Sequence, residues 1–475
     1  MVSIFTIYDL TFLVVFTLGV ILFLYTHKKN LQRQGLLYLY RTKIGINFID
    51  KFTKKFEKVL YPLQYIIVFS GFTLMFSMLW LLIKFSWSYI TSPVIAQAIK
   101  IPVVIPLIPY LPEIFKIDFL PSFNFTYWII VIAIIAIPHE FAHGIFARLN
   151  KVKVHSTGFG FLGPFLAAFV EPDEKQMEKL KKFPQMAILA SGTFANIIFT
   201  IFFGIIMWLF FISAFVPAGV IFNAYATSVI DVSSINSING INIVSSDQIA
   251  PALNNNISKI ISNNSTYFVP SNSLKLAVEN SVPRINVFDD SPAYEANLEG
   301  AITEINGGKI TSYNQLHSVI VSHSSGDVLH IKTAYQKTVR ENEVELKEYD
   351  IKLSERNGVA FLGIGRYESS RSGLLGSVYS VISSVKDPFT YYESSLGVFG
   401  WFIYYLLWWT VLISLSVALV NMLPVGIFDG GKFFYLAVWG VTGSENIAKK
   451  AFKVSTWFIL ALIAALMVKW LLLFV

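Results

Sequence analysis

Six long apolar runs interrupt the chain, and each is long enough to cross a bilayer as a helix. They lie at about residues 8–25, 62–85, 126–149, 185–214, 395–422 and 452–475. A helix needs about 20 mostly apolar residues to cross the hydrocarbon core of a membrane. The pattern therefore predicts a polytopic α-helical membrane protein with about six transmembrane helices, in which residues 8–25 are a retained span rather than a signal peptide.

Residues 219–366 break this pattern, because they are polar and rich in Asn, Ser and β-branched residues. Two stretches within them match at an offset of 67 residues. They are residues 235–243 with Gln248, and residues 302–310 with Gln315. Each predicts a strand, an Asn-Gly turn, a second strand and a helix. The repeat predicts two related α+β modules rather than one large domain.

Composition agrees with a membrane protein, since 54% of the residues are hydrophobic and only 14% are charged. The net charge of +7 comes from basic residues that cluster in loops 26–61, 149–184 and 423–451, whereas loop 86–125 holds few. By the positive-inside rule, both termini and residues 219–366 lie outside the cell membrane. The clustering does not indicate nucleic-acid binding. Cysteine is absent, which excludes disulfides, a thiolate nucleophile and cysteine metal ligands.

The run at 126–149 carries His139-Glu140-Phe141-Ala142-His143 near its end. Positions i and i+4 share one face of a helix, so both imidazoles can bind one metal ion. Glu140 lies beside them, where it can take a proton from a water molecule. The alternative is a chance pattern on a buried helix, which the cost of ionisable groups in apolar surroundings disfavours.

A catalytic zinc ion usually has three protein ligands and one open position. The remaining histidines fall in the polar region or in basic loops. They are His27, His155, His317, His323 and His330. Asp429 and Glu171 are the acidic candidates for the third ligand, and Asp429 is favoured because it ends the fifth span at the depth of the histidines. The alternative for Asp429 is a helix cap before Gly430.

Residues 158–170 are apolar, too short to span a membrane, and broken by glycines and Pro164. We expect a re-entrant hairpin or loop beside the metal. One interpretation is an edge that receives a substrate strand by β-addition, with Gly160, Phe161 and Pro164 as substrate contacts. The other is a packed interfacial loop.

Three further segments carry weaker signals. Asn196, in the fourth run, is a buried polar residue that needs a partner, and the metal site is one candidate. Repeated prolines in 92–122 predict an extended or broken segment at the outer interface. Residues 374–385 predict an amphipathic helix on the outer surface, which acts either as a gate or as a plain linker.

Together these motifs resemble the site-2 protease family of intramembrane zinc metalloproteases. The resemblance rests on His139-Glu140-x-x-His143, on Asn421-x-x-Pro424-x-x-x-x-Asp429-Gly430, and on the small-residue segment that ends in Asn196. The insert at 219–366 resembles the PDZ domains that this family often carries between core spans.

The resemblance implies that His139, His143 and Asp429 bind one Zn²⁺ and that Glu140 is the general base. It makes Asn196 and Asn421 candidates for orienting substrate or stabilising an oxyanion, with a helix–helix hydrogen bond as the alternative for each. The expected activity is hydrolysis of peptide bonds within or next to transmembrane segments of membrane proteins. A zinc-containing membrane scaffold or PDZ adaptor, which binds partners without cleaving them, is the competing function.

The resemblance also implies a division of the chain into six parts. These are an accessory transmembrane region at 1–120, the first half of the catalytic core at 121–218, a tandem PDZ-like insert at 219–366, an amphipathic interfacial segment at 367–392, the second half of the core at 393–431, and a C-terminal transmembrane helix at 432–475. The insert would bind a peptide or a C-terminus, or act as a size filter.

Overall fold

The computed structural model describes residues 4–34, 37–92, 107–115, 117, 120–162, 165–254, 256–335, 344–367, 379–380 and 383–472. The chain divides into two compact units. The membrane unit comprises Met1–Phe210 and Phe402–Val475, and the insert unit comprises Phe211–Trp401. Each unit is described separately below.

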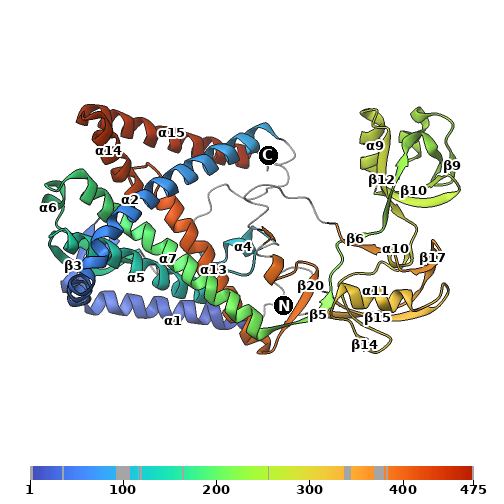
Figure 1. The fold of residues 1–475 in the computed structure, drawn as a ribbon, viewed down its shortest axis with the longest axis horizontal. Coiled ribbons are helices and arrows are strands. Elements are labelled where there is room, and N and C mark those ends of the chain that lie inside the picture. Colours follow the sequence, from blue (N-terminus) through green and yellow to red (C-terminus); the bar gives the residue numbers. More distant parts are fainter. Residues whose placement is uncertain are drawn as a thin grey trace. The chain divides into compact units, whose positions relative to one another are not determined.

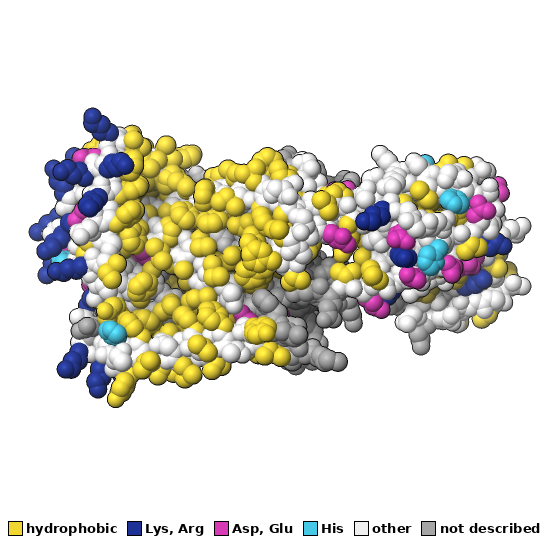
Figure 2. Space-filling view, turned by 90° about the horizontal axis from the view of Figure 1, so that it is seen from below, with side chains coloured by type: hydrophobic (Ala, Val, Ile, Leu, Met, Phe, Trp, Pro, Cys, Tyr) yellow, Lys and Arg dark blue, Asp and Glu magenta, His cyan; other side chains and the backbone are white. Residues whose placement is uncertain are grey.

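Six described helices are long and apolar enough to span a membrane, which confirms the predicted number of spans. They are α1 (Ile4–Thr26), α2 (Ile46–Thr91), α5 (Phe125–Leu149), α7 (Lys182–Ala214), α13 (Gly397–Asn421) and α15 (Glu445–Leu471) (Figure 1). Their surfaces expose large apolar side chains such as Val15, Phe69 and Ile205. Figure 2 shows a broad hydrophobic surface on the membrane unit, with Lys and Arg side chains gathered at one end. Such a surface is stable in lipid rather than in water, so the chain is a membrane protein.

Helix α2 is 46 residues long and begins well before the predicted span at 62–85. Its first turns run through a lysine-rich segment and pack on α5. Asp50 forms two hydrogen bonds of 2.5 and 2.9 Å with the Arg148 guanidinium, and the methyl end of Ile49 lies where a side chain at Gly144 would be. The first part of α2 therefore supports the segment of α5 that carries the histidines.

A four-stranded antiparallel sheet lies in the membrane unit, in the order β1-β2-β3-β4. Its strands are β1 (Leu31–Gln34), β2 (Leu37–Thr42), β3 (Val154–Leu162) and β4 (Phe165–Pro172). The glycine-rich segment predicted as a hairpin or loop is the β3–β4 hairpin. Strand β3 pairs with β2 on one side and β4 on the other, so β4 is an open edge.

Helix α1 is joined to the start of α5 by one buried carboxylate. Asp9 is 2% exposed, and its two oxygens accept hydrogen bonds of 2.9 Å from the backbone N–H groups of Phe125 and Thr126. The hydroxyls of Thr126 and Tyr110 also donate to it. The first N–H groups of a helix have no partner within the helix, so Asp9 caps α5 from 116 residues away in the sequence.

The insert unit contains two mixed modules, each with its own sheet and apolar core. The first sheet has the order β7 (Thr227–Asp231), β12 (Arg284–Asp289), β11 (Ser265–Pro270), β10 (Ile257–Ser262), β8 (Ile235–Ile238), β9 (Ile241–Asn242). The second has the order β16 (Glu345–Lys352), β15 (Val328–Tyr335), β13 (Ala301–Ile305), β5 (Phe215–Val220), β20 (Thr390–Ser394), and β14 (Gly308–Lys309) pairs with β13.

The repeated Asn-Gly turns have the same geometry in both modules. Asn239 and Asn306 have φ values of 50° and 51°, as an Asn-Gly hairpin turn requires. The side chain of Asn239 accepts from the N–H of Lys259, and that of Asn306 accepts from the N–H of His330, both at 2.9 Å. The two repeated sequence segments therefore form equivalent hydrogen bonds from their turn asparagines.

The insert unit is longer at both ends than residues 219–366, because β5 and β20 pair with each other and join the second sheet. The helix predicted at 374–385 falls largely outside the described residues, as do the prolines at 93, 102 and 106. In the remainder of the proline-rich segment, α4 (Leu111–Ile114) forms a single short turn.

Candidate metal centre

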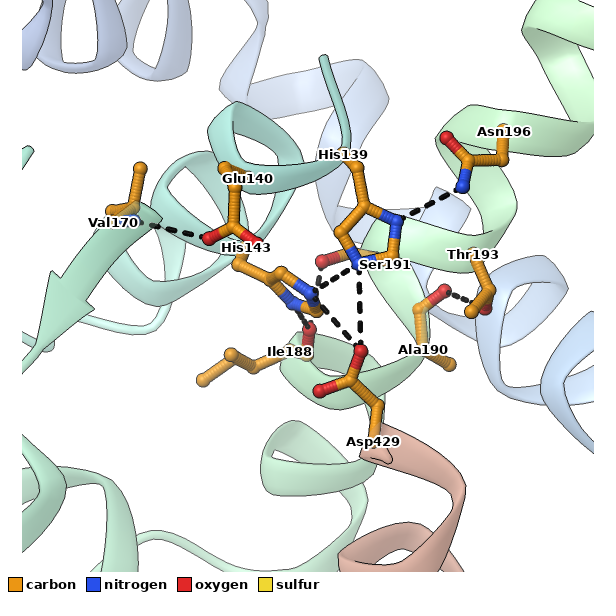
Figure 3. Close-up of polar contacts among 10 residues, drawn as sticks. All are labelled: His139, Glu140, His143, Val170, Ile188, Ala190, Ser191, Thr193, Asn196 and Asp429. Atoms are coloured by element: carbon orange, nitrogen blue, oxygen red, sulfur yellow. Dashed lines mark hydrogen bonds and ion pairs between the residues drawn. The ribbon is translucent and has the colours of Figure 1, made fainter. Parts of the chain in front are cut away.

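Three side chains from two distant segments converge in the membrane unit. His139 and His143 lie on one face of α5, and Asp429 is the first residue of α14 (Asp429–Thr442). The Asp429 Oδ2 atom lies 3.5 Å from His139 Nε2 and 3.3 Å from His143 Nε2, and the two Nε2 atoms are 3.2 Å apart (Figure 3). All three potential ligand atoms lie within 4.8 Å of one another, so they could hold one metal ion.

A glycine on α7 leaves the space in front of these nitrogens free. A Cβ atom at Gly192 would lie 2.5 Å from His143 Nε2 and 2.6 Å from His139 Nε2. Any side chain there would occupy the position that an ion bound to both nitrogens needs. The absence of a side chain at Gly192 therefore fits a metal at this place.

The other imidazole nitrogen of each histidine faces α7. His143 Nδ1 lies 2.7 Å from the carbonyl oxygen of Ile188. A carbonyl only accepts hydrogen bonds, so Nδ1 carries the proton and Nε2 keeps its lone pair for a metal.

The partner of His139 is Asn196, whose amide nitrogen lies 3.1 Å from His139 Nδ1. The Asn196 Oδ1 atom is buried and has no hydrogen-bond partner. A half turn of the amide exchanges its oxygen and nitrogen without moving any other group, and it makes Oδ1 the acceptor for His139 Nδ1–H. That orientation leaves the lone pair of His139 Nε2 free as well, so the donor set suits zinc.

Glu140 lies beside the two histidines, as Figure 3 shows, and points toward the four-stranded sheet. Its Oε2 atom accepts a 3.0 Å hydrogen bond from the backbone N–H of Val170 in β4. The candidate base is therefore tied to the open edge strand.

A tight loop brings Asp429 to α5. The fifth span ends at Asn421, and a Cβ atom at Gly430 or Gly431 would lie 2.4 Å from the carbonyl oxygens of Met422 or Val425, respectively. The two glycines allow the loop to fold back on the start of α14. Asp429 thus opens the next helix, which corrects the prediction that it ends the fifth span.

The alternative third ligand, Glu171, is engaged elsewhere. Its carboxylate is bound by Arg41 at 2.8 Å and by the Ser156 hydroxyl at 2.6 Å. Among the described residues, His139, His143 and Asp429 form the metal-binding group, and Glu171 is outside it.

The remaining predicted residues that the structure describes do not belong to the three-ligand group. Gly160 and Phe161 are on β3, which is paired on both sides, so their backbone groups cannot take up a further strand. Within the described residues of segment 158–170, β4 is the strand that has a partner strand on one side and none on the other. Pro164 lies outside the described residues. Asn421 is half-buried and lines an apolar cavity of about 510 Å³ beside Leu412 and Val417.

Four contributors to this region were not predicted: the space at Gly192, the Ile188 carbonyl, the Val170 N–H and the cap by Asp9. The small-residue segment around Gly192 indicated close helix packing, but not against histidines. Backbone groups leave no signal in a sequence. Asp9 did leave one, because a carboxylate in an apolar span needs an explanation.

Helix α5 and the start of α14 bring two histidines and an aspartate together in a unit with six candidate membrane-spanning helices, so the fold and site define a membrane protein with a candidate metal centre. Residues 127–466 match the model of Peptidase family M50. This match covers most of the chain, so the chain belongs to Peptidase family M50. The resemblance to the site-2 protease family is thereby confirmed, whereas the PDZ-like character of the insert remains a prediction.

Two kinds of relatives share parts of the sequence. A protein of Xylella fastidiosa named "Putative zinc metalloprotease" is 41% identical over 68 residues, which are 14% of this chain and 14% of that protein. Uncharacterized protein MJ0971 of Methanocaldococcus jannaschii is 31% identical over 191 residues, 39% of this chain and 47% of that protein. The matches thus span less than half the length of these relatives.

Proposed function

We propose that this protein is an intramembrane zinc metalloprotease of the site-2 type, which hydrolyses peptide bonds within or next to transmembrane segments of membrane proteins. The convergence of His139, His143 and Asp429, with Glu140 beside them, carries this proposal. A purely structural metal site would need no carboxylate at the position of Glu140. Membership of a peptidase family and the name of the Xylella relative support the same activity.

In this proposal His139, His143 and Asp429 hold one Zn²⁺. When bound there, zinc supplies a Lewis acid that lowers the pKa of water to about 7 and polarises a peptide carbonyl. Glu140 takes a proton from the attacking water and gives it to the leaving amine. Asn196 and the Ile188 carbonyl hold the imidazoles in the required tautomer. We assign Asn196 to this role rather than to oxyanion binding.

The expected orientation places the metal centre near the cytoplasmic side and the insert unit outside. His139 and His143 lie within the last ten residues or so of α5, and a segment rich in lysine follows. Figure 2 shows the basic end of the membrane unit, which supports this orientation through the positive-inside rule.

The substrates in this proposal are membrane proteins whose spanning helix unwinds locally. A helix hides its peptide bonds in its own hydrogen bonds, so helix-breaking residues near the cleavage site should favour hydrolysis. In the insert unit, a groove of about 360 Å³ between α11 (Tyr313–Val321) and β18 (Val359–Phe361) supports a role in binding peptides or C-termini. The PDZ-like modules would then select substrates by their soluble ends.

The test is cleavage of a panel of single-span reporter proteins by the purified full-length protein in liposomes. Wild type is compared with Glu140→Gln, which keeps the size of the side chain and all three metal ligands. We expect cleavage within the reporter's span by wild type, and loss of cleavage in Glu140→Gln and after treatment with a zinc chelator. Zinc content, measured on the same samples, should stay at one ion per chain in Glu140→Gln.

Equal cleavage by wild type and Glu140→Gln would overturn the proposal, because it would point to a contaminating protease. Binding of reporters without cleavage by zinc-loaded wild type, across the whole panel, would favour a membrane scaffold or adaptor instead.

A further inference from the structure

The hairpin that joins β10 to β11 ends in a two-residue turn in the first module of the insert unit. Ser262 and Ser265 are the last paired residues of the two strands, so Asn263 and Asn264 form the turn. Their φ values are 51° and 66°, and a tight hairpin turn of this kind requires a positive φ at both positions. Both asparagines are exposed. The turn therefore presents two asparagine side chains to the solvent.

The second position of this turn differs from that of three other hairpin turns in the insert unit. Those three turns place glycine there, because glycine adopts a positive φ without strain: Gly240, Gly307 and Gly358. Asn264 takes the same left-handed conformation although it carries a side chain. Among the described residues, no hydrogen bond or ion pair engages that side chain. Turn geometry alone therefore favours glycine at this position and does not account for Asn264.

The residues that follow the turn complete an acceptor pattern for N-linked glycosylation, which is Asn-x-Ser or Asn-x-Thr. Asn264-Ser265-Thr266 matches this pattern, and Asn263 matches it through Ser265. The chain has two further matches, at residues 124–126 and 256–258. So short a pattern arises by chance in a sequence rich in asparagine, so the way in which the fold presents each match has to decide between them.

The fold disfavours the two matches outside the turn. An acceptor needs both the asparagine amide and the hydroxyl two residues later, and the attached sugar is bulky and hydrophilic. Asn124 is only 7% exposed, and the Thr126 hydroxyl donates to Asp9. Asn256 is exposed, but Ser258 is fully buried and its hydroxyl is already hydrogen-bonded. The turn between β10 and β11 is thus the place where a sugar chain fits.

We propose that Asn264 carries an N-linked oligosaccharide. The donor is an oligosaccharide linked to a lipid phosphate, and a membrane-bound transferase catalyses the step. The amide nitrogen of Asn264 forms a bond to C1 of the first sugar, while the bond between C1 and the phosphate oxygen breaks. One amide proton passes to the released lipid phosphate, and nothing is oxidised or reduced. This inference rests on the proposed orientation, in which the insert unit lies outside the membrane, where such donors are used.

The test begins with the full-length protein purified from the membranes of the cells that make it naturally. Trypsin cleaves after Lys259 and Lys275, so peptide 260–275 holds both asparagines of the turn and excludes Asn256. Mass spectrometry of this peptide shows whether it carries a sugar chain, and fragmentation that leaves the sugar attached shows on which asparagine. We expect an oligosaccharide on Asn264 in most copies of the peptide.

Variants expressed in the same cells separate the two overlapping patterns. Thr266→Ala removes the hydroxyl that Asn264 needs but leaves the pattern at Asn263, and occupancy should fall to about a tenth of wild type or less. Ser265→Ala is the matched control, because it destroys the pattern at Asn263 and keeps Thr266, so occupancy should be unchanged. Asn264→Gly should lose the sugar and still fold, since glycine suits a turn residue with positive φ.

The orientation is measured separately. The chain has no cysteine, so a single introduced thiol reports the side of the membrane on which it lies. Ser325, in the insert unit, and Lys450, near the start of α15, are both exposed. In intact cells a membrane-impermeant maleimide should label Ser325→Cys and not Lys450→Cys. Both should react after the cells are permeabilised.

The expected result is a sugar on Asn264 that is lost in Thr266→Ala and Asn264→Gly and kept in Ser265→Ala. An unmodified peptide 260–275, from a protein in which Ser325→Cys is labelled from outside, overturns the inference and leaves the orientation standing. A sugar that persists in Asn264→Gly also overturns it. Labelling of Lys450→Cys instead of Ser325→Cys in intact cells overturns the orientation together with the inference. The proposed protease activity is tested independently, by cleavage of the reporters.

Discussion

The carboxylate of Asp9 accepts hydrogen bonds from both the backbone N–H and the hydroxyl of Thr126, at 2.9 and 2.5 Å. Asp9 belongs to the first span and Thr126 to the first turn of the helix that carries the histidines. The residue at the N-cap of that helix, Asn124, makes no side-chain capping bond. The first span therefore supplies the cap that the local sequence lacks.

Asp9→Ala should lower the stability of the membrane unit by roughly 3 kcal/mol, because two backbone N–H groups at the start of α5 lose their acceptor in a buried place. The measurement is the midpoint of thermal unfolding in detergent. Asp9→Asn keeps an acceptor and should lose less. Thr11→Val, which removes an exposed hydroxyl that donates to the Ile7 carbonyl within α1, is the control. Equal midpoints for Asp9→Ala and Thr11→Val would contradict the capping role.

Gly192→Ala should remove zinc binding while the protein stays folded. The added methyl group would lie 2.5–2.6 Å from both histidine Nε2 atoms, in the place of the ion. Zinc content of the purified variant is the measurement. Gly204→Ala, on the same helix with nothing within 4 Å of its new Cβ, should bind zinc like wild type. A zinc-loaded Gly192→Ala variant would show that the ion is held elsewhere.

Asn196→Ala should weaken zinc affinity roughly 10- to 100-fold, because the partner that orients a liganding histidine is lost. Competition with a chelator of known affinity measures the change. Asn196→Asp retains an acceptor for His139 Nδ1–H and should bind more tightly than Asn196→Ala. As a control, Thr200→Val removes a hydroxyl that bonds the Asn196 carbonyl and leaves the amide in place. Unchanged affinity in Asn196→Ala would assign that side chain to helix packing alone.

The short helix α6 (Glu174–Glu178) that follows β4 should loosen in acid. The Gln176 N–H donates to the Asp173 side chain and, with His155, holds the pKa of this half-buried carboxyl below its usual value of 3.8. A lowered folded pKa gives stability that is full above pH 3.8 and is lost as the pH falls through the folded value. The measurement is the protection of the Gln176 amide against hydrogen exchange, followed as a function of pH. Asp173→Asn keeps an acceptor that does not titrate, so protection of its Gln176 amide should not change with pH. If protection fell equally in both proteins on acidification, Asp173 would not be the titrating group.

The pair of histidines could be predicted from the sequence because their spacing of four residues is a local property of one helix. For the third ligand, the sequence left two candidates, Asp429 and Glu171. The choice between them depends on how a loop 286 residues after His143 packs against α5. Gly430 and Gly431 make that packing possible, and their role becomes visible only when the carbonyls of Met422 and Val425 are in place. The sequence therefore predicted the two histidine ligands, which lie on one helix, but the choice of the aspartate ligand required the tertiary structure.

The same division holds for the fold. The Asn-Gly turns at Asn239 and Asn306 were predicted, because a two-residue hairpin turn is set by local backbone conformation. The strands β1 and β2 were not predicted, and their segment appeared only as a basic loop. Strand pairing between β2 and β3 joins residues that are far apart in the sequence, so no local sequence pattern predicts it.

The pairing of β2 with β3 also has a consequence for biosynthesis. Thr42 and Thr157, which face each other across these strands, are 115 residues apart. At about 5–20 residues per second, the ribosome needs on the order of 6–23 s to make the intervening chain. During that interval the edge of β2 that pairs with β3 in the folded protein has no partner, because β3 is synthesised only after α5. If synthesis stalls after β2 and before β3, the nascent chain therefore exposes an unpaired strand edge that can pair with other chains.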